Sequence, residues 1–578
     1  MAPITNNGST ANGINEWTIM VFIANNDDLS PLIISQLKAI KEAGFQNKTD
    51  VLVYVDATEQ GAPTRVYNVN QGRKKLAQFE IGDGEDPYVR NLVHDNIDPK
   101  NDIDINGKPF SKALKESLEN TVPNTSTSAG QVNTVSNNKA LQALTNFINF
   151  GRENHRAKHY MLFMLGHGMI VGNDAFLPDQ SSGSAIKLTE LGAVLSEFKK
   201  RMQADKETFE LLAMHSCSMS AAEVAFELKG TAKYMLASEG TTFVGSWPYR
   251  QVLKKIFKTI QLAQKAVEST GKEPDYDVDT LMQKIYFLSL FQSTDFMLSG
   301  FSADLSLCNL DPKILGRSKE RLIILVEELK KGLDDDAARE LIVLAHCKSQ
   351  AYWNESYTDL YDFCLCLQKS CQARSNYASL TSLSKACGDV IGELEKDGSD
   401  PFNRLVIFSE HFGPKYQYSH GLSVYFPWAK PIENANENVI ANYREYLFTT
   451  EFPEDGSWLS FIEKYCDKTK RPSRIKEDEE RSSAKAQPQP SAEGNGLNLV
   501  QFAESSSHAG ALEHKAGGAL ENKAGGAVGS TCDCPSIKNY GKFSISPAAA
   551  LAFDEDDDKR LPDRRQRAKR QSASQRSA

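Results

Sequence analysis

Residues 160–168 read Tyr-Met-Leu-Phe-Met-Leu-Gly-His-Gly, an uninterrupted apolar run that ends in a Gly-His-Gly turn. Residues 209–214 form a second, largely apolar run, and it leads into His215-Ser-Cys-Ser. Apolar runs without polar alternation are typical of strands that are covered on both faces, as in parallel sheets. The two segments therefore predict two strands of a buried sheet, each followed by a polar turn at its carboxyl end.

Three further apolar runs fit this pattern, at residues 17–24, 51–55 and 234–237. Amphipathic stretches with a period near 3.6 residues lie between the runs and predict helices. They cover residues 30–43, 138–154, 188–202 and 219–229. Because strands alternate with helices along the chain, the sequence predicts an α/β fold with a mostly parallel β-sheet flanked by helices.

Composition divides the chain into four parts. Residues 1–15 are polar and predict a flexible N-terminus, whereas residues 16–250 contain the predicted sheet, with a polar insertion at about 59–136. Residues 251–466 mix helical and strand patterns and predict a C-terminal α+β region packed on the sheet domain. Residues 467–578 are charged and rich in Pro, Ser and Gly, so we expect a disordered low-complexity tail.

The bulk composition disfavours several classes of protein. A formal net charge of −9 does not favour nucleic-acid binding, and no apolar run approaches the roughly 18 residues of a membrane span. The first residues lack the basic and apolar regions of a signal peptide, which favours a cytoplasmic over a secreted protein. The ten cysteines show no repeated CxxC framework, which predicts mostly buried free thiols rather than a zinc site.

The two polar turns carry residue types that suit nucleophilic catalysis. Active residues of open parallel sheets lie just beyond the carboxyl ends of the strands, so we expect His167 and Cys217 side by side. A cysteine thiolate is a nucleophile near neutral pH, and an imidazole can carry a proton to a leaving amine. The amides of Gly168 and Cys217 are candidates for an oxyanion hole. A helix beginning at Met219 would lower the pKa of the thiol through its positive end.

Either residue alone has an ordinary explanation, since histidines occur incidentally in turns and cysteines are often buried thiols. The pair is more informative because both residues end strands in consecutive βα units. A nucleotide-binding α/β protein is disfavoured, because no GxGxxG or Walker loop follows a predicted strand.

Several separated segments together resemble the clostripain family of cysteine peptidases, which belongs to the clan of caspases, gingipains and legumain. The similar segments are residues 17–29, 160–168, 215–219, 234–239, 247–249 and 421–427, and the resemblance spans about residues 15–466. It implies a caspase-like fold and a cysteine endopeptidase with a His167–Cys217 dyad that acts on proteins or peptides. It also implies substrate-binding roles for His215, Ser238, Glu239 and Trp247. The chemistry requires no cofactor, although the family often uses calcium.

The chain departs from the family pattern at the residues that select the cleavage site. The family usually has Asp two residues before the catalytic cysteine, where this chain has His215, and residues 240–246 contain no acid. We therefore expect a weak or absent preference for basic residues. Glu239 could still select them or could be a structural carboxylate, and His215 could instead favour an acidic or polar side chain. No Lys or Arg occurs between Gly168 and Lys187, so self-processing is not expected.

The sequence leaves calcium binding and catalytic activity open. Asn25-Asn-Asp-Asp28 and Asp56 could bind calcium or could be solvated turn residues, and they show no EF-hand spacing. The altered specificity residues leave a rival to the peptidase, namely a catalytically inactive binding or scaffold protein on the same fold. The oligomeric state is not predicted.

Overall fold

The computed structural model describes most of residues 14–55 and 138–469. The described ranges are 14–24, 36–37, 39–40, 42–44, 46–55, 65–68, 138–168, 176–179, 184–243, 245–271, 274, 276–291, 302–353, 355–374, 378–395, 400–430 and 439–469. Residues 1–13, most of the expected insertion at 59–136 and residues 470–578 lie outside them.

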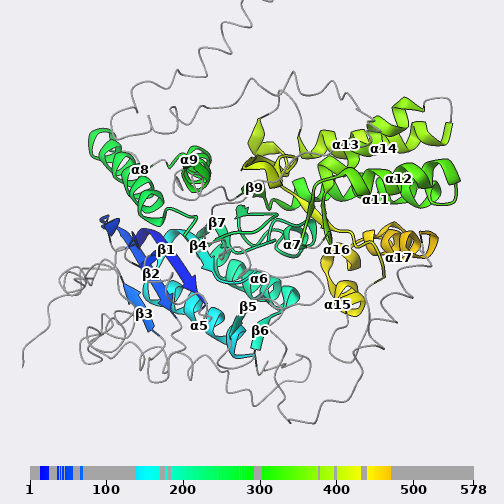
Figure 1. The fold of residues 1–578 in the computed structure, drawn as a ribbon. Helices are drawn as coiled ribbons and strands as arrows, with labels where there is room; N and C mark the ends of the chain where they lie inside the picture. The colour runs from blue at the N-terminus through cyan, green and yellow to red at the C-terminus, as the bar shows by residue number, and fades with distance from the viewer. Residues whose placement is uncertain are drawn as a thin grey trace, which may run out of the picture. The chain divides into compact units, whose positions relative to one another are not determined.

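An eight-stranded sheet forms the centre of the described structure (Figure 1). Its order is β12 (Val406–Phe412), β9 (Ala303–Asn309), β8 (Tyr234–Ala237), β7 (Thr208–His215), β4 (Ala157–Leu165), β1 (Asn15–Ile23), β2 (Thr49–Val55) and β3 (Arg65–Asn68). The five strands from β8 to β2 run parallel, and β3, β9 and β12 pair antiparallel at the edges. The predicted mostly parallel sheet is confirmed.

Alternate residues of the central strands enter two separate hydrophobic cores. In β1, Met20 and Phe22 belong to one core, whereas Ile19, Val21 and Ile23 belong to the other. Successive side chains of a strand point to opposite faces, so a strand covered on both faces needs apolar residues throughout. This arrangement explains the uninterrupted apolar runs of the sequence.

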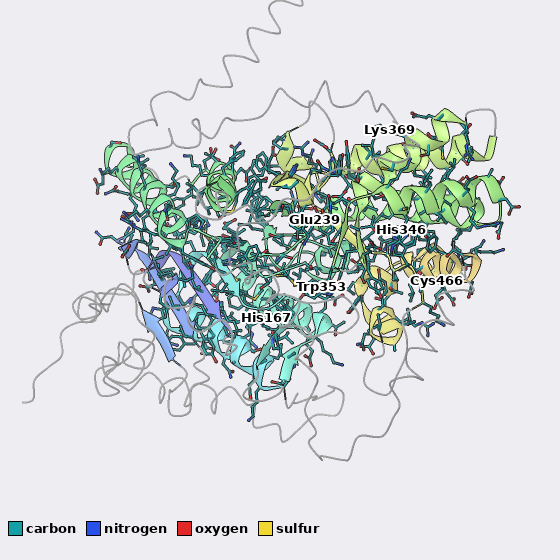
Figure 2. All side chains as sticks on the ribbon, in the orientation of Figure 1. His167, Glu239, His346, Trp353, Lys369 and Cys466 are labelled. Carbon is teal, nitrogen blue, oxygen red and sulfur yellow. The ribbon has the colours of Figure 1, made fainter. Side chains whose placement is uncertain are left out.

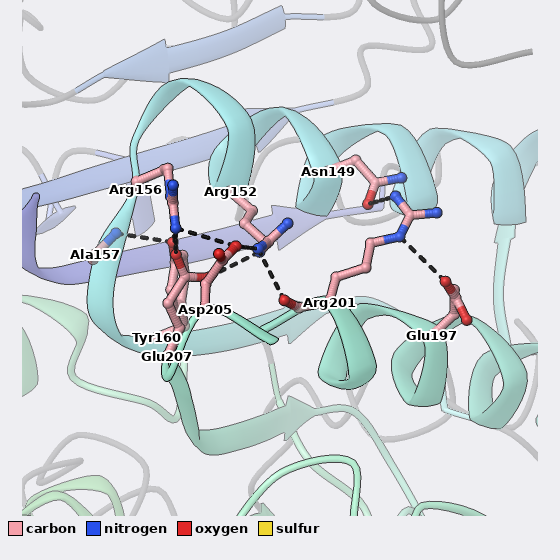
Figure 3. A network of polar contacts seen from close by, with 9 residues as sticks. All are labelled: Asn149, Arg152, Arg156, Ala157, Tyr160, Glu197, Arg201, Asp205 and Glu207. Carbon is pink, nitrogen blue, oxygen red and sulfur yellow. Dashed lines mark hydrogen bonds and ion pairs between the residues drawn. The ribbon is translucent and has the colours of Figure 1, made fainter. Parts of the chain in front are cut away.

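Helices cover both faces of the sheet. One face packs against α5 (Lys139–Asn154), α6 (Leu188–Ala204) and α7 (Ala222–Glu227). The other packs against α8 (Tyr249–Thr270) and α9 (Val278–Phe291). Ion pairs fix the amino ends of two neighbouring strands, because Glu207 before β7 binds Arg152 and Arg156 at 2.9 and 2.7 Å (Figure 3). The opposite, carboxyl ends of β4 and β7 carry the two polar turns.

The region after residue 300 extends the same sheet and adds a helical layer. Strands β9 and β12 both come from this region. Its helices are α11 (Pro312–Gly332), α12 (Asp336–Lys348), α13 (Leu360–Ala373), α14 (Ala378–Leu394), α15 (Val439–Glu445), α16 (Leu447–Thr450) and α17 (Trp458–Lys468). A small antiparallel sheet contains β10 (Ala351–Tyr352), β11 (Tyr357–Asp359) and β13 (Ser423–Tyr425). A separate hairpin contains β5 (Phe176–Asp179) and β6 (Ser184–Ile186).

Two further properties of the described residues bear on the sequence analysis. Their cysteines are free thiols and most are buried, as predicted. None of their helices is long and apolar enough to cross a membrane.

Candidate active site

The parallel pairing of β4 and β7 brings the two polar turns together. Leu165 lies opposite His215 in the register, and the Gly166 amide donates to the His215 carbonyl at 3.4 Å. The chain therefore leaves both strands at the same level. His167 follows β4 after one intervening residue, Gly166, and Cys217 likewise follows β7 after one residue, Ser216.

Gly168 packs directly against the backbone of Cys217. A β-carbon on Gly168 would lie 1.7 Å from the Cys217 carbonyl oxygen and 2.7 Å from its nitrogen. Only a residue without a side chain permits such an approach. Because His167 precedes Gly168, the predicted pair lies at one place on the sheet edge. His167, Gly168 and Cys217 are each partly exposed, so reagents in solution can reach this point.

The Cys217 thiol contacts the backbone of Thr242, which follows β8. The Thr242 amide donates to Sγ at 3.3 Å, and Sγ lies 3.5 Å from the Thr242 carbonyl oxygen. Burial raises the pKa of the Cys217 thiol, and the hydrogen bonds with Thr242 oppose this effect. Burial thus disfavours the thiolate, and Cys217 requires a base before it can act as a nucleophile.

The helix start expected directly after Cys217 is wrong. Helix α7 begins at Ala222 rather than at Met219, so its amino end does not follow the cysteine directly. Ser218 adopts a left-handed conformation with φ 57°, and Ala221 forms a bridge with Ser423 of β13. These contacts keep the chain after Cys217 out of the helix.

The two amides proposed for an oxyanion hole lie beside each other. Within the described ranges, no backbone carbonyl accepts a hydrogen bond from the Gly168 or the Cys217 amide.

His215 is a buried residue that organises the segment after β8. Its side chain stacks on Trp247 with ring centroids 4.5 Å apart, and Nε2 lies 2.7 Å from the Phe243 carbonyl oxygen. A carbonyl only accepts, so Nε2 carries the proton and Nδ1 accepts from the Tyr249 hydroxyl at 3.2 Å. Burial lowers the pKa of His215 to about 3. The imidazole is therefore neutral, and it offers no positive charge to an acidic substrate.

The other predicted substrate-binding side chains are also buried. Ser238 donates to the Asp304 carbonyl at 2.8 Å, and Trp247 is covered by its stacking on His215. Glu239 is 0% exposed and accepts from the Gly421 amide at 2.8 Å. Burial raises the pKa of Glu239, with Asp359 as a second cause. This geometry favours the structural alternative for Glu239.

Among the described residues, neither a metal-binding cluster nor His346 contributes to the site. The described residues contain no group of three or more side chains placed to hold a metal ion, and the expected calcium residues 25–28 and Asp56 lie outside the described ranges. His346 is buried in the helical region, away from His167 (Figure 2). It stacks on Phe426 at 3.7 Å and on Trp428 at 3.9 Å.

Glu223, a buried carboxyl group of α7, connects the helix after Cys217 to the C-terminal region. Its Oε1 accepts from the Tyr443 hydroxyl at 2.6 Å and from the Tyr425 amide at 3.0 Å. Burial raises its pKa to about 7. The folded protein therefore holds the proton to a higher pH than the unfolded chain does.

This difference predicts a pH dependence of stability. Between about pH 4.5 and 7 the folded state binds more protons at Glu223 than the unfolded chain does. The contribution of Glu223 to the free energy of unfolding is therefore fully present at low pH, and roughly 3 kcal/mol of it is lost as pH rises through this range. Glu223→Gln cannot titrate. Urea unfolding at pH 5 and pH 7.5 is expected to show the variant gaining stability relative to the unsubstituted protein as pH rises. An equal pH dependence of both proteins would contradict this assignment.

Two contributors to the site were missed from the sequence. Asp304 of β9 and Tyr416 of the 3₁₀ turn Pro414–Tyr416 both contact the segment beside Cys217. The acidic Asp304 in an otherwise buried strand was the available signal for the first. Tyr416 carried no comparable signal.

Comparison with known proteins identifies the family. The model of the clostripain family matches residues 21–465, which is more than half of the chain. The chain is 22% identical to clostripain of Hathewaya histolytica over 362 residues. This match covers 56% of the chain and 62% of that relative, which is less than two thirds of its length.

Solved structures of C11 proteases are also similar. One is an inactive zymogen from Parabacteroides distasonis, with 15% identity, a TM-score of 0.40 and coverage of 77% of this chain and 100% of that chain. Another is a secreted cysteine protease from Bacteroides thetaiotaomicron in complex with an irreversible peptide inhibitor, with 14% identity, a TM-score of 0.42 and coverage of 77% and 99%. Because its family model matches residues 21–465, the chain belongs to the clostripain family of cysteine peptidases.

Proposed function

We propose that the chain is a cysteine endopeptidase that uses Cys217 as nucleophile and His167 as the group that moves the proton. The observation that carries the proposal is the close packing of Gly168 on the Cys217 backbone, which brings His167 and Cys217 to one partly exposed point. Membership of the clostripain family supports the same reaction class.

The proposed reaction assigns a role to each group. His167 takes the proton from the Cys217 thiol, whose pKa is raised by burial, and the thiolate attacks the scissile carbonyl. The Gly168 and Cys217 amides donate to the oxyanion. His167 then gives the proton to the leaving amine as the C–N bond breaks. Water hydrolyses the resulting thioester, which releases the acid product and restores the thiol. These steps need no cofactor.

The rival function is an inactive binding or scaffold protein, and cysteine reactivity separates the two. In an enzyme, iodoacetamide should alkylate Cys217 with a pH profile set by His167, and His167→Ala should change that profile. In the rival, Cys217 should react no faster than an ordinary thiol, whether or not His167 is replaced.

Specificity follows from the groups around the candidate site. His215 is neutral, Glu239 is bound to Gly421, and both oxygens of Asp304 accept backbone amides. A Lys or Arg side chain that enters a pocket needs a carboxylate to replace its lost hydration. None of these side chains offers an accessible, charged carboxylate, because Glu239 and Asp304 are 0% and 3% exposed and burial raises the pKa of Glu239. The protein substrates are therefore proposed to present neutral residues at the cleaved position.

We predict that kcat/KM for a peptide with Gln at the cleaved position equals or exceeds that for the matched Arg peptide. The measurement compares otherwise identical substrates with Arg, Lys, Gln or Asp at this position. A preference of tenfold or more for Arg would show that a carboxylate from elsewhere in the chain lines the site.

A further inference from the structure

Residues 239–242 form the part of the chain that lies against the nucleophile, and they leave β8 without continuing its pairing with β7. The parallel pairing of β7 with β8 ends at Ala213 and Leu236. Beyond it, the Ser218 amide donates to the Gly240 carbonyl at 3.0 Å, and Thr242 contacts Cys217 Sγ. The position of this segment therefore depends on groups other than the ladder of the parallel strands.

Asp304 of β9 holds the first half of the segment. One carboxylate oxygen accepts from the Glu239 amide at 2.6 Å, and the other accepts from the Gly240 amide at 2.9 Å. Asp304 is 3% exposed, and its own carbonyl accepts from the Ser238 hydroxyl. Both carboxylate oxygens are thus engaged by two successive amides, a charge-assisted arrangement that fixes backbone direction.

Tyr416 holds the second half of the segment 239–242. Its hydroxyl accepts from the Thr241 amide at 3.0 Å and lies 3.3 Å from the Thr241 hydroxyl. The ring packs on Gly240 so closely that a β-carbon there would lie 2.4 Å from Cζ. Residues 239, 240 and 241 are therefore each held through the backbone amide, directly before the residue that contacts the thiol.

We propose that Asp304 and Tyr416 are positioning residues that hold residues 239–242 as a wall of the substrate site. This inference rests on the proposed peptidase function and deepens it. The partly exposed residues Thr241 and Thr242 form the face of the wall, and Asp304 supports it from the buried side.

Two other roles for Asp304 disagree with the structure. A buried carboxylate occupied by two amides cannot reach a basic substrate side chain. Asp304 also raises the pKa of Cys217 through its negative charge, as a smaller cause than burial, so it does not activate the thiol. Its contacts instead act on the backbone beside the thiol.

The test compares Asp304→Asn and Tyr416→Phe with a matched control, Asp311→Asn. Asp311 follows the same strand at its other end and accepts from the Lys313 amide, remote from the site. For each protein we would measure kcat and KM for a peptide, the rate of Cys217 alkylation by iodoacetamide, and hydrogen–deuterium exchange of residues 238–243.

Asp304→Asn is expected to lower kcat/KM by roughly tenfold to hundredfold, mainly through KM, because the amide side chain can accept only one of the two bonds. Alkylation should stay equal or become faster, since a negative charge near the thiol is lost. Exchange of residues 238–243 should increase. Tyr416→Phe should show smaller changes in the same direction, and Asp311→Asn should match the unsubstituted protein.

The proposal is overturned if exchange and kcat/KM are unchanged in both variants, or if alkylation falls in proportion to cleavage, which would mean general damage to the site. If Asp304→Asn does not fold, Tyr416→Phe alone tests the proposal, because this substitution removes only one oxygen atom and should leave the fold intact. Exchange does not depend on activity. A protein without Cys217-dependent cleavage would therefore contradict the proposed function, whereas unchanged exchange would contradict the positioning role.

Discussion

Cys217→Ala is expected to abolish peptide cleavage while leaving the fold intact. The proposed reaction uses no other nucleophile at the strand end. In a serine protease, removal of the nucleophile of the catalytic triad costs on the order of 10⁶ in kcat. The thiol is partly exposed and packs on backbone atoms of Thr242, so its loss creates little cavity. Activity on a peptide library and the melting temperature measure the two effects.

Cys366→Ala provides the matched control, because Cys366 of α13 is also a partly exposed free thiol but lies outside the site. It should retain full activity. His167→Ala should retain a trace of peptidase activity, with a loss of about 10²–10⁴-fold, since the imidazole assists proton transfer but does not form the covalent bond. Cleavage by Cys217→Ala at the unsubstituted rate would exclude the proposed mechanism.

The strands and the meeting of the two turns could be predicted because they depend on local patterns. The apolar runs at 17–24 and 160–165 need burial on both faces, and parallel strands carry their carboxyl ends to one edge. The juxtaposition of His167 and Cys217 follows from these two facts without knowledge of any side-chain contact.

The directions of side chains beyond the strand ends could not be predicted in the same way. Alternation of side chains is reliable only within a strand, and β8 ends at Ala237. Ser238 and Glu239 therefore gave no indication that both are buried. Their partners, Asp304 and Gly421, come from strands and turns that are 66 and 182 residues away. Such contacts depend on tertiary packing and leave no periodic pattern.

His215 shows why a family position does not define a role by itself. The residue stands where the family usually has an acid, and its type alone allowed either a charged group in the pocket or a structural one. The stacking on Trp247 and the bond to the Phe243 carbonyl bury the ring and keep it neutral. The same replacement that removes a negative charge thus supplies a hydrogen-bond donor to the segment after β8.

Gly168→Ala is expected to reduce activity strongly, although less than loss of the nucleophile does. The added β-carbon would lie 1.7 Å from the Cys217 carbonyl oxygen, 2.6 Å from its carbonyl carbon and 2.7 Å from its nitrogen. All three are backbone atoms, so no flexible side chain can move aside. The turn that carries His167 must then shift away from Cys217. Because a displacement of about 1 Å can cost 10²-fold, and the oxyanion donor moves as well, we expect a loss of roughly 10³-fold or more in kcat/KM.

Gly316→Ala in α11 is the matched control, because a β-carbon there meets no atom within 4 Å. A glycine in a helix interior is less favourable than alanine, so this variant should gain about 0.5–1 kcal/mol of stability and keep full activity. Gly168→Ala should instead lose roughly 2–4 kcal/mol, as expected for a substitution that forces backbone apart. Urea unfolding and kcat/KM, measured on both variants, separate the loss of stability from the loss of activity. Normal activity of Gly168→Ala would mean that the turns are not in contact in solution, and the geometric basis for the His167–Cys217 pair would be lost with it.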